Sequence, residues 1–161
     1  MAVMTTPNSF AHGEITGAVI DGFVQTYEEL GSGFAERVCV KALAIVLQER
    51  GLRVWTNAEI AVLFHKQRIG RFYADMVVNE TVLLEIKSGQ PLDGYAQAQL
   101  LNYLKAAGGG VGLLLNFGRR PEHKRMVMGD PFDSLPLLRR GEPRQTSRAP
   151  GPRERVGALG E

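Results

Sequence analysis

Two apolar stretches near the middle of the chain carry charged residues. Asp75 lies in the stretch 71–78, and Glu85 and Lys87 lie in the stretch 82–87. Successive side chains of a strand alternate between faces, so Glu85 and Lys87 share one face. The other residues of both stretches are largely apolar on both faces, so these charges are expected to be buried. Buried charges are rare unless they are paired or bind a metal.

The spacing of the two stretches predicts a hairpin. A three-residue loop, 79–81, would pair residues whose numbers sum to 160 and place Asp75 opposite Glu85. A two-residue turn would place Leu84 there instead. Two close carboxylates repel unless a cation or a proton lies between them, and Mg²⁺ or Mn²⁺ prefers such oxygen ligands. Lys87 could then hold or deprotonate a water, or stabilise a phosphate, but the spacing allows a salt bridge of Lys87 with either carboxylate equally well.

Three further residues are weaker candidates. Glu36 would be a third carboxylate, although with Gly33 as the N-cap it is the third residue of a helix, where a carboxylate already favours the helix dipole. Capping alone explains Glu36 better than metal binding does. Gln99 and Tyr103 lie four residues apart on a predicted helix and therefore share a face.

Hydrophobic periodicity predicts helices first, then a hairpin-rich sheet, a helix and a further strand. This order indicates an α/β or α+β class with a mixed β-sheet flanked by helices. The predicted helices span 14–30, 34–50 and 93–107, with Asp93 as an N-cap; the extended segments span 52–64, 71–78, 82–87, 111–117 and 123–128, with a turn at 65–70.

Composition indicates one soluble domain. The 161 residues are 44% hydrophobic and 22% charged, which excludes collagen-like, coiled-coil and wholly disordered proteins. The net charge of +2 does not by itself indicate nucleic-acid binding. We expect residues 1–13 to be a flexible N-terminus and residues 139–161 to be a basic, disordered tail. The positive charge of this tail is more commonly explained by solvation than by contact with phosphates. The single cysteine allows no intrachain disulfide, and no leader or membrane span is evident, so a cytoplasmic location without membrane partners is expected.

The candidate residues together resemble a known pattern. The chain has a Gly-x-x-Glu helix start at Gly33, a strand Asp at position 75, Glu-x-Lys at position 85 and Gln-x-x-x-Tyr at position 99, followed by VGLLLNFG from position 111. This order, from about residue 14 to residue 128, resembles the PD-(D/E)xK nuclease superfamily, and more narrowly the small bacterial GxxExxY proteins.

The resemblance implies a nuclease-like domain over 14–138 in which Asp75 and Glu85, with Glu36 contributing, bind Mg²⁺ or Mn²⁺. It implies that Lys87 positions the attacking water, and that Gln99 and Tyr103 orient the site or contact the nucleic-acid backbone.

The chain departs from the pattern at two positions. Cys39 stands where the family name expects Tyr, and Ala74 stands where Pro is common before the strand Asp. Every implied ligand and the lysine are present. The sequence therefore predicts a metal-dependent nuclease acting on DNA or RNA, and the alternative is a non-catalytic nucleic-acid- or protein-binding module on the same fold. Metal-dependent thermal stabilisation distinguishes the two.

Overall fold

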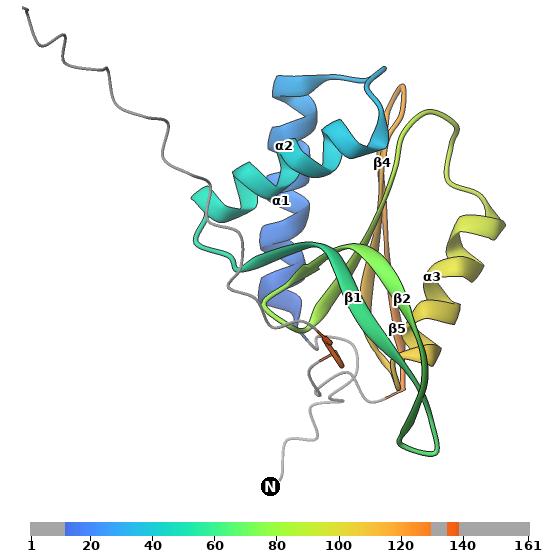
Figure 1. The fold of residues 1–161 in the computed structure, drawn as a ribbon. Coiled ribbons are helices and arrows are strands. Elements are labelled where there is room, and N and C mark those ends of the chain that lie inside the picture. Colours follow the sequence, from blue (N-terminus) through green and yellow to red (C-terminus); the bar gives the residue numbers. More distant parts are fainter. Residues whose placement is uncertain (1–11, 130–134, 139–161) are drawn as a thin grey trace, which may run out of the picture.

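A five-stranded mixed sheet lies between helices (Figure 1). The structure is a computed structural model and describes residues 12–129 and 135–138. Its elements are α1 (Gly13–Leu30), α2 (Glu36–Glu49), β1 (Val54–Phe64), β2 (Gln67–Val78), β3 (Val82–Lys87), α3 (Gly94–Ala106), β4 (Gly110–Phe117) and β5 (Pro121–Met128). The strand order is β1-β2-β3-β4-β5, with β3 and β4 parallel and the other neighbours antiparallel. The predicted α+β class with a mixed, helix-flanked sheet is confirmed.

Both faces of the sheet are covered, as the apolar strands require. Helices α1 and α2 pack on one face, with Phe23 and Leu43 among their fully buried side chains. Helix α3 packs on the other face through Leu100 and Leu104. Strand β4 is buried along its whole length, so it has the continuous apolar sequence of a central strand instead of an alternating one.

The parallel pairing of β3 with β4 needs a crossover connection, and α3 provides it. Asp93 caps this helix as predicted, because its side chain accepts a hydrogen bond from the backbone N–H of Ala96 at 2.9 Å. The crossover places the first turns of α3 beside the carboxyl end of β3. This is the end of the sheet at which Glu85 and Lys87 lie.

Two local predictions were wrong. The turn between β1 and β2 is two residues long instead of six, because both His65 and Lys66 adopt the left-handed backbone conformation (φ 48° and 61°) that a tight hairpin turn needs. Helix α2 begins at Glu36 after Ala35 as the N-cap, whereas the sequence suggested Gly33. Gly33 has a φ of 96°, which belongs to the turn between the two helices. Glu36 is therefore the first residue of its helix and not the third.

The predicted flexible segment at 1–13 lies almost wholly outside the described residues, and the predicted basic tail at 139–161 lies wholly outside them. Among the residues that the structure describes, no helix is long and apolar enough to cross a membrane.

The contact between α1 and β4 offers a test of the core. Phe117 is fully buried and its ring meets that of Phe23 edge-on, with centroids 5.0 Å apart. Phe117→Ala should lower the free energy of unfolding by about 3–5 kcal/mol, because it removes a large buried ring and leaves a cavity. Urea denaturation followed by circular dichroism measures the loss. Phe64→Ala, at a phenylalanine that is 61% exposed, is the matched control and should change the free energy by less than about 0.5 kcal/mol. Equal losses in the two variants would contradict this core assignment.

Candidate functional site

The site is built where β2 and β3 diverge. Their antiparallel ladder has the predicted register, but it ends at the pair Met76–Leu84, one pair before Asp75 would face Glu85. Beyond it, the Asp75 carboxylate accepts a hydrogen bond from the backbone N–H of Ile86 at 2.8 Å. A side chain thus replaces the missing ladder bond, and it holds the Asp75 carboxylate beside β3.

An irregularity in the neighbouring strand accompanies this divergence. Asn57 of β1, opposite Asp75 in the register, has a φ of 49° and is absent from the regular pairing. The side chains of β2 change faces at this point. Met76, which follows Asp75, packs toward α1 and α2, whereas Ala74, which precedes it, packs toward α3. Strict alternation would place Ala74 and Phe72 on the same face as Met76, and it does not continue through this irregularity.

Glu85 is the most perturbed ionisable group of the site. Its side chain is 6% exposed, and its Oε1 is buried and has no hydrogen-bond partner among the described residues. Burial, and next the charge of Asp75, raise the pKa of Glu85 from 4.5 to about 8, while a backbone hydrogen bond from Asp75 and the charge of Lys87 act in the opposite direction. The two carboxylates therefore interact, as the hairpin register predicts.

Lys87 is held by α3 and not by the carboxylates. Its Nζ donates to Oε1 of Gln99 at 3.3 Å, and Nε2 of Gln99 donates to the Tyr103 hydroxyl at 3.1 Å. The Tyr103 ring in turn stacks on Phe72 of β2, with centroids 4.5 Å apart and planes 11° from parallel. Among the described residues Lys87 forms no ion pair within 4.0 Å, so the salt-bridge alternative is not what the structure shows.

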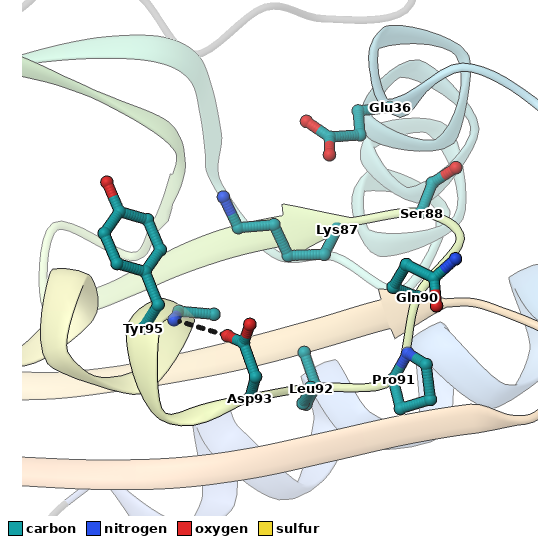
Figure 2. A pocket seen from close by; sticks show the side chains of 9 residues that line it. Glu36, Lys87, Ser88, Gln90, Pro91, Leu92, Asp93 and Tyr95 are labelled. Carbon is teal, nitrogen blue, oxygen red and sulfur yellow. Dashed lines mark hydrogen bonds between the residues drawn. The ribbon is translucent and has the colours of Figure 1, made fainter.

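Glu36 lies at the edge of the site. It lines two open hollows, one of about 260 Å³ with Lys87 and the loop 88–93, and one of about 400 Å³ with Asp75 and the start of α2. In Figure 2 the side chains of Glu36 and Lys87 extend over the first hollow from α2 and β3 respectively. Within residues 12–129 and 135–138, no three His, Cys, Asp or Glu side chains are grouped closely enough to hold a metal. The structure therefore brings Asp75 and Glu85 together and leaves Glu36 outside a three-carboxylate group.

The loop after β3 is fastened from three sides. Ser88 donates to the carbonyl of Phe34 at 2.6 Å, which ties the start of α2 to the end of β3. Asn116 of β4 donates its Nδ2 to the carbonyl of Gln90 at 2.8 Å, and Glu122 of β5 accepts from the backbone N–H of Leu92 at 3.3 Å. These bonds fix Glu36 and Lys87 relative to one another.

Sequence reasoning missed Asn116 as a site residue. It is fully buried and neighbours Lys87 in the parallel ladder, and within the part of the chain that the structure describes its Oδ1 has no hydrogen-bond partner. The signal was one polar residue at the end of an otherwise apolar strand, read only as part of VGLLLNFG.

The residues present fit a divalent cation. Asp75 and Glu85 are hard oxygen donors with like charges, and Glu85 Oε1 is a buried acceptor with no partner. A cation bound between them would supply the missing partner and remove the repulsion. The donor set carries no thiol or imidazole, which favours Mg²⁺ or Mn²⁺ over zinc.

The fold and the site define a class of protein: an α+β domain with an acidic pair and a lysine at one end of a mixed sheet. The family described as the PD-(D/E)XK nuclease superfamily matches residues 13–126. The chain belongs to this superfamily. No curated protein and no solved structure matches the chain significantly.

The raised pKa of Glu85 predicts how the stability of metal-free protein depends on pH. In the unfolded chain Glu85 ionises near pH 4.5 and in the folded chain near pH 8, so the folded state binds more protons between these values. Its stabilising contribution is full below about pH 4.5 and is lost as the pH rises through about 8, by at most about 1.4 kcal/mol per pH unit. Glu85→Gln should remove this dependence, as measured by urea denaturation in EDTA at several pH values.

The exposed Glu49→Gln serves as the matched control and should retain the wild-type slope. A Glu85→Gln variant with an unchanged slope would show that Glu85 does not ionise in this range.

Proposed function

We propose that the protein is a metal-dependent nuclease that hydrolyses phosphodiester bonds in DNA or RNA. The observation that carries the proposal is the pair of half-buried Asp75 and buried Glu85 beside Lys87, at the same open end of the sheet as the two hollows. Membership of a nuclease superfamily supports it. Buried like charges are costly for a fold that does not use them, which argues for a role other than packing.

The cation would be held by Asp75 and Glu85, and Glu36 is proposed as a further ligand from across the hollow. When bound, Mg²⁺ or Mn²⁺ polarises a phosphate and lowers the pKa of a bound water. Asp75 stays oriented because the Ile86 N–H occupies one lobe of its carboxylate. Glu85 is held by β3, which is paired with β4 along its whole length.

Lys87 is proposed to position the attacking water and to place positive charge where a phosphorane-like transition state gains negative charge. Gln99 directs the ammonium group by accepting one of its protons, and Tyr103 fixes the Gln99 amide by accepting from Nε2. Gln99 and Tyr103 are thus positioning residues for Lys87, and their solvent-facing parts are available to the nucleic-acid backbone. Arg119, which is exposed, is proposed to add sequence-independent phosphate contacts.

We also propose a narrower relationship to the GxxExxY proteins. Gly33 supplies the left-handed turn just before α2, and Glu36 opens that helix beside the site. Cys39 takes the position of the family tyrosine; it is fully buried, and its Sγ lies 4.0 Å from the carbonyl of Phe34. The tyrosine hydroxyl is thus absent, while the helix start that carries Glu36 is kept. A cytoplasmic location stays a prediction.

Metal binding is tested by thermal unfolding. Mg²⁺ or Mn²⁺ at about 100 times the dissociation constant should stabilise the wild-type protein by about 2.7 kcal/mol, seen as a rise in Tm over EDTA. Asp75→Asn and Glu85→Gln should abolish the rise because each removes a ligand charge. Glu49→Gln, exposed at the end of α2, should keep the rise in full. A rise of the same size in all variants would place the metal elsewhere.

Cleavage is tested with end-labelled single- and double-stranded DNA and RNA in Mg²⁺, Mn²⁺ and EDTA. Lys87→Ala should lower the cleavage rate by about 10²–10³, in line with the loss of one preorganised group that stabilises the transition state. Lys105→Ala, at an exposed lysine in the last turn of α3, is the matched control and should cut at the wild-type rate. Equal rates for the two variants would contradict the role given to Lys87. Wild-type protein that binds metal but cuts none of the four substrates would favour the binding-module alternative.

A further inference from the structure

The hairpin of β1 and β2 extends beyond the rest of the sheet (Figure 1). Within β2, strand β3 pairs with Met76–Val78 alone, so from Asp75 back to Gln67 the only sheet neighbour of β2 among the described residues is β1. The end of this arm is formed by Phe64–Ile69, six residues that are all exposed. We call these six residues the hairpin tip.

The hairpin tip exposes apolar surface that the fold does not use. Phe64 and Ile69 are 61% and 66% exposed, which makes them two of the most exposed large apolar side chains among the described residues. The Phe64 ring stacks on His65, with centroids 4.3 Å apart and planes 25° from parallel. Two stacked, exposed rings form a surface on which a further flat ring can stack.

The hairpin tip also carries positive charge that no nearby acidic side chain within the described ranges neutralises. Between Glu59 and Asp75 the sequence has no acidic residue, and in this arm Arg71 forms an ion pair with Glu59 at 2.7 Å. Lys66 and Arg68 are exposed and, among the residues that the structure describes, form no ion pair. The body of the chain up to residue 118 is faintly acidic, with 9 Lys and Arg against 11 Asp and Glu. The positive charge at the hairpin tip is therefore a local feature.

The turn carries these side chains at a conformational cost. Both turn residues, His65 and Lys66, have positive φ, for which Asn-Gly is the favoured pair in a two-residue hairpin turn. A histidine and a lysine are strained there, and nothing in the fold requires their side chains, since both are exposed.

We propose that the hairpin tip is a second nucleic-acid contact, in which Lys66 and Arg68 bind backbone phosphates and the Phe64–His65 stack receives an unpaired base. The combination of cations with stacked aromatic rings favours a single strand or a strand end over a protein partner. The contact rests on the proposed nuclease function, because the same strand, β2, carries Asp75 toward its other end.

The geometry sets a length requirement on the nucleic acid. Eight residue steps separate Gln67 from Asp75 along β2, which at about 3.3 Å per residue is about 26 Å. At about 3.4 Å per nucleotide this span corresponds to about eight nucleotides. An oligonucleotide that reaches the carboxylate pair but is shorter than this cannot also reach the hairpin tip.

The test measures binding and not cleavage, by fluorescence anisotropy in EDTA with labelled single-stranded oligonucleotides of about 6 and about 24 nucleotides. For the longer probe, the double variant Lys66→Ala/Arg68→Ala should weaken binding by about tenfold and lower the slope of log K against log salt by about 1.5. Phe64→Ala should weaken it by at least about fivefold through lost stacking. In EDTA the Asp75–Glu85 pair repels the shorter probe, which is expected to occupy the hairpin tip alone, so its binding should weaken in both variants as well.

The matched control is Arg50→Ala/Arg53→Ala, which removes two exposed arginines next to α2 and outside the arm. This variant has the same net charge as the first, so a nonspecific charge effect would weaken both equally. Equal weakening, or no weakening in the tip variants, would overturn the proposal. Wild-type protein that binds neither probe would overturn it as well, whether or not the protein cuts.

A second variant separates binding from a structural role. His65→Asn/Lys66→Gly installs the favoured turn pair, so it should raise Tm while it weakens binding of the longer probe. A rise in Tm with unchanged binding would contradict the proposal. Gel filtration with light scattering of the same variants tests whether the hairpin tip instead binds a second copy of this chain. If the wild-type protein is a dimer, and the variants lose the dimer but keep nucleic-acid binding, the hairpin tip is a contact between copies and the proposal is overturned. If the wild-type protein cleaves nucleic acid and the tip variants bind it as tightly as the wild type, the nuclease function is supported and only the second contact is overturned.

Discussion

The organisation of the site depends on one unmet backbone requirement. Strand β3 is buried, and after Leu84 its edge toward β2 has no ladder partner. A buried N–H without an acceptor costs about 1–3 kcal/mol, so Ile86 needs one. The Asp75 carboxylate fills this need and is thereby fixed next to Glu85. The acidic pair is thus a consequence of two strands diverging under a hydrogen-bond constraint.

The surrounding elements keep this arrangement rigid. On one side, the parallel ladder with β4 fixes the direction of β3, and Asn116 fastens the following loop. On the other, the hydrogen bonds from Lys87 through Gln99 to Tyr103 end on an aromatic stack with Phe72 of β2. The strand that supplies Asp75 and the helix that holds Lys87 are therefore connected directly. A charged group positioned in this way needs little reorganisation when charge develops nearby, which is the physical basis of electrostatic catalysis.

Strand β2 joins two environments of opposite charge. At its inner end Asp75 lies beside a buried carboxylate whose pKa is raised by burial and by that proximity. At its outer end exposed cations and a ring stack extend into solvent. The carboxylate end repels an anionic polymer until a cation is bound there, whereas the hairpin tip attracts it. The two ends of one rigid strand therefore suit different parts of the same extended ligand.

The sequence by itself determined the elements and most of the site. Alternation along 82–87 placed Glu85 and Lys87 on one face. The sequence allowed two registers for the hairpin, and the one with a three-residue loop is the register that the ladder from Val78–Val82 to Met76–Leu84 shows. The four-residue spacing put Gln99 and Tyr103 together, and the structure shows them hydrogen-bonded. Local rules failed where backbone conformation was set by distant contacts. The left-handed turn at His65 and the face change around Asn57 have only a weak signal in residue type, because Asn and His adopt positive φ more often than most residues but far less readily than glycine.

Only the tertiary structure decided which charges meet. The sequence allowed Lys87 to pair with a carboxylate, and the packing of α3 gave it Gln99 instead. The docking of α2 left Glu36 across a hollow from Asp75, and the parallel pairing of β3 with β4 made Asn116 part of the site. Those outcomes depend on how helices from separate parts of the chain dock on the sheet. The contacts that fix this docking are long-range, so no local pattern of residues encodes them.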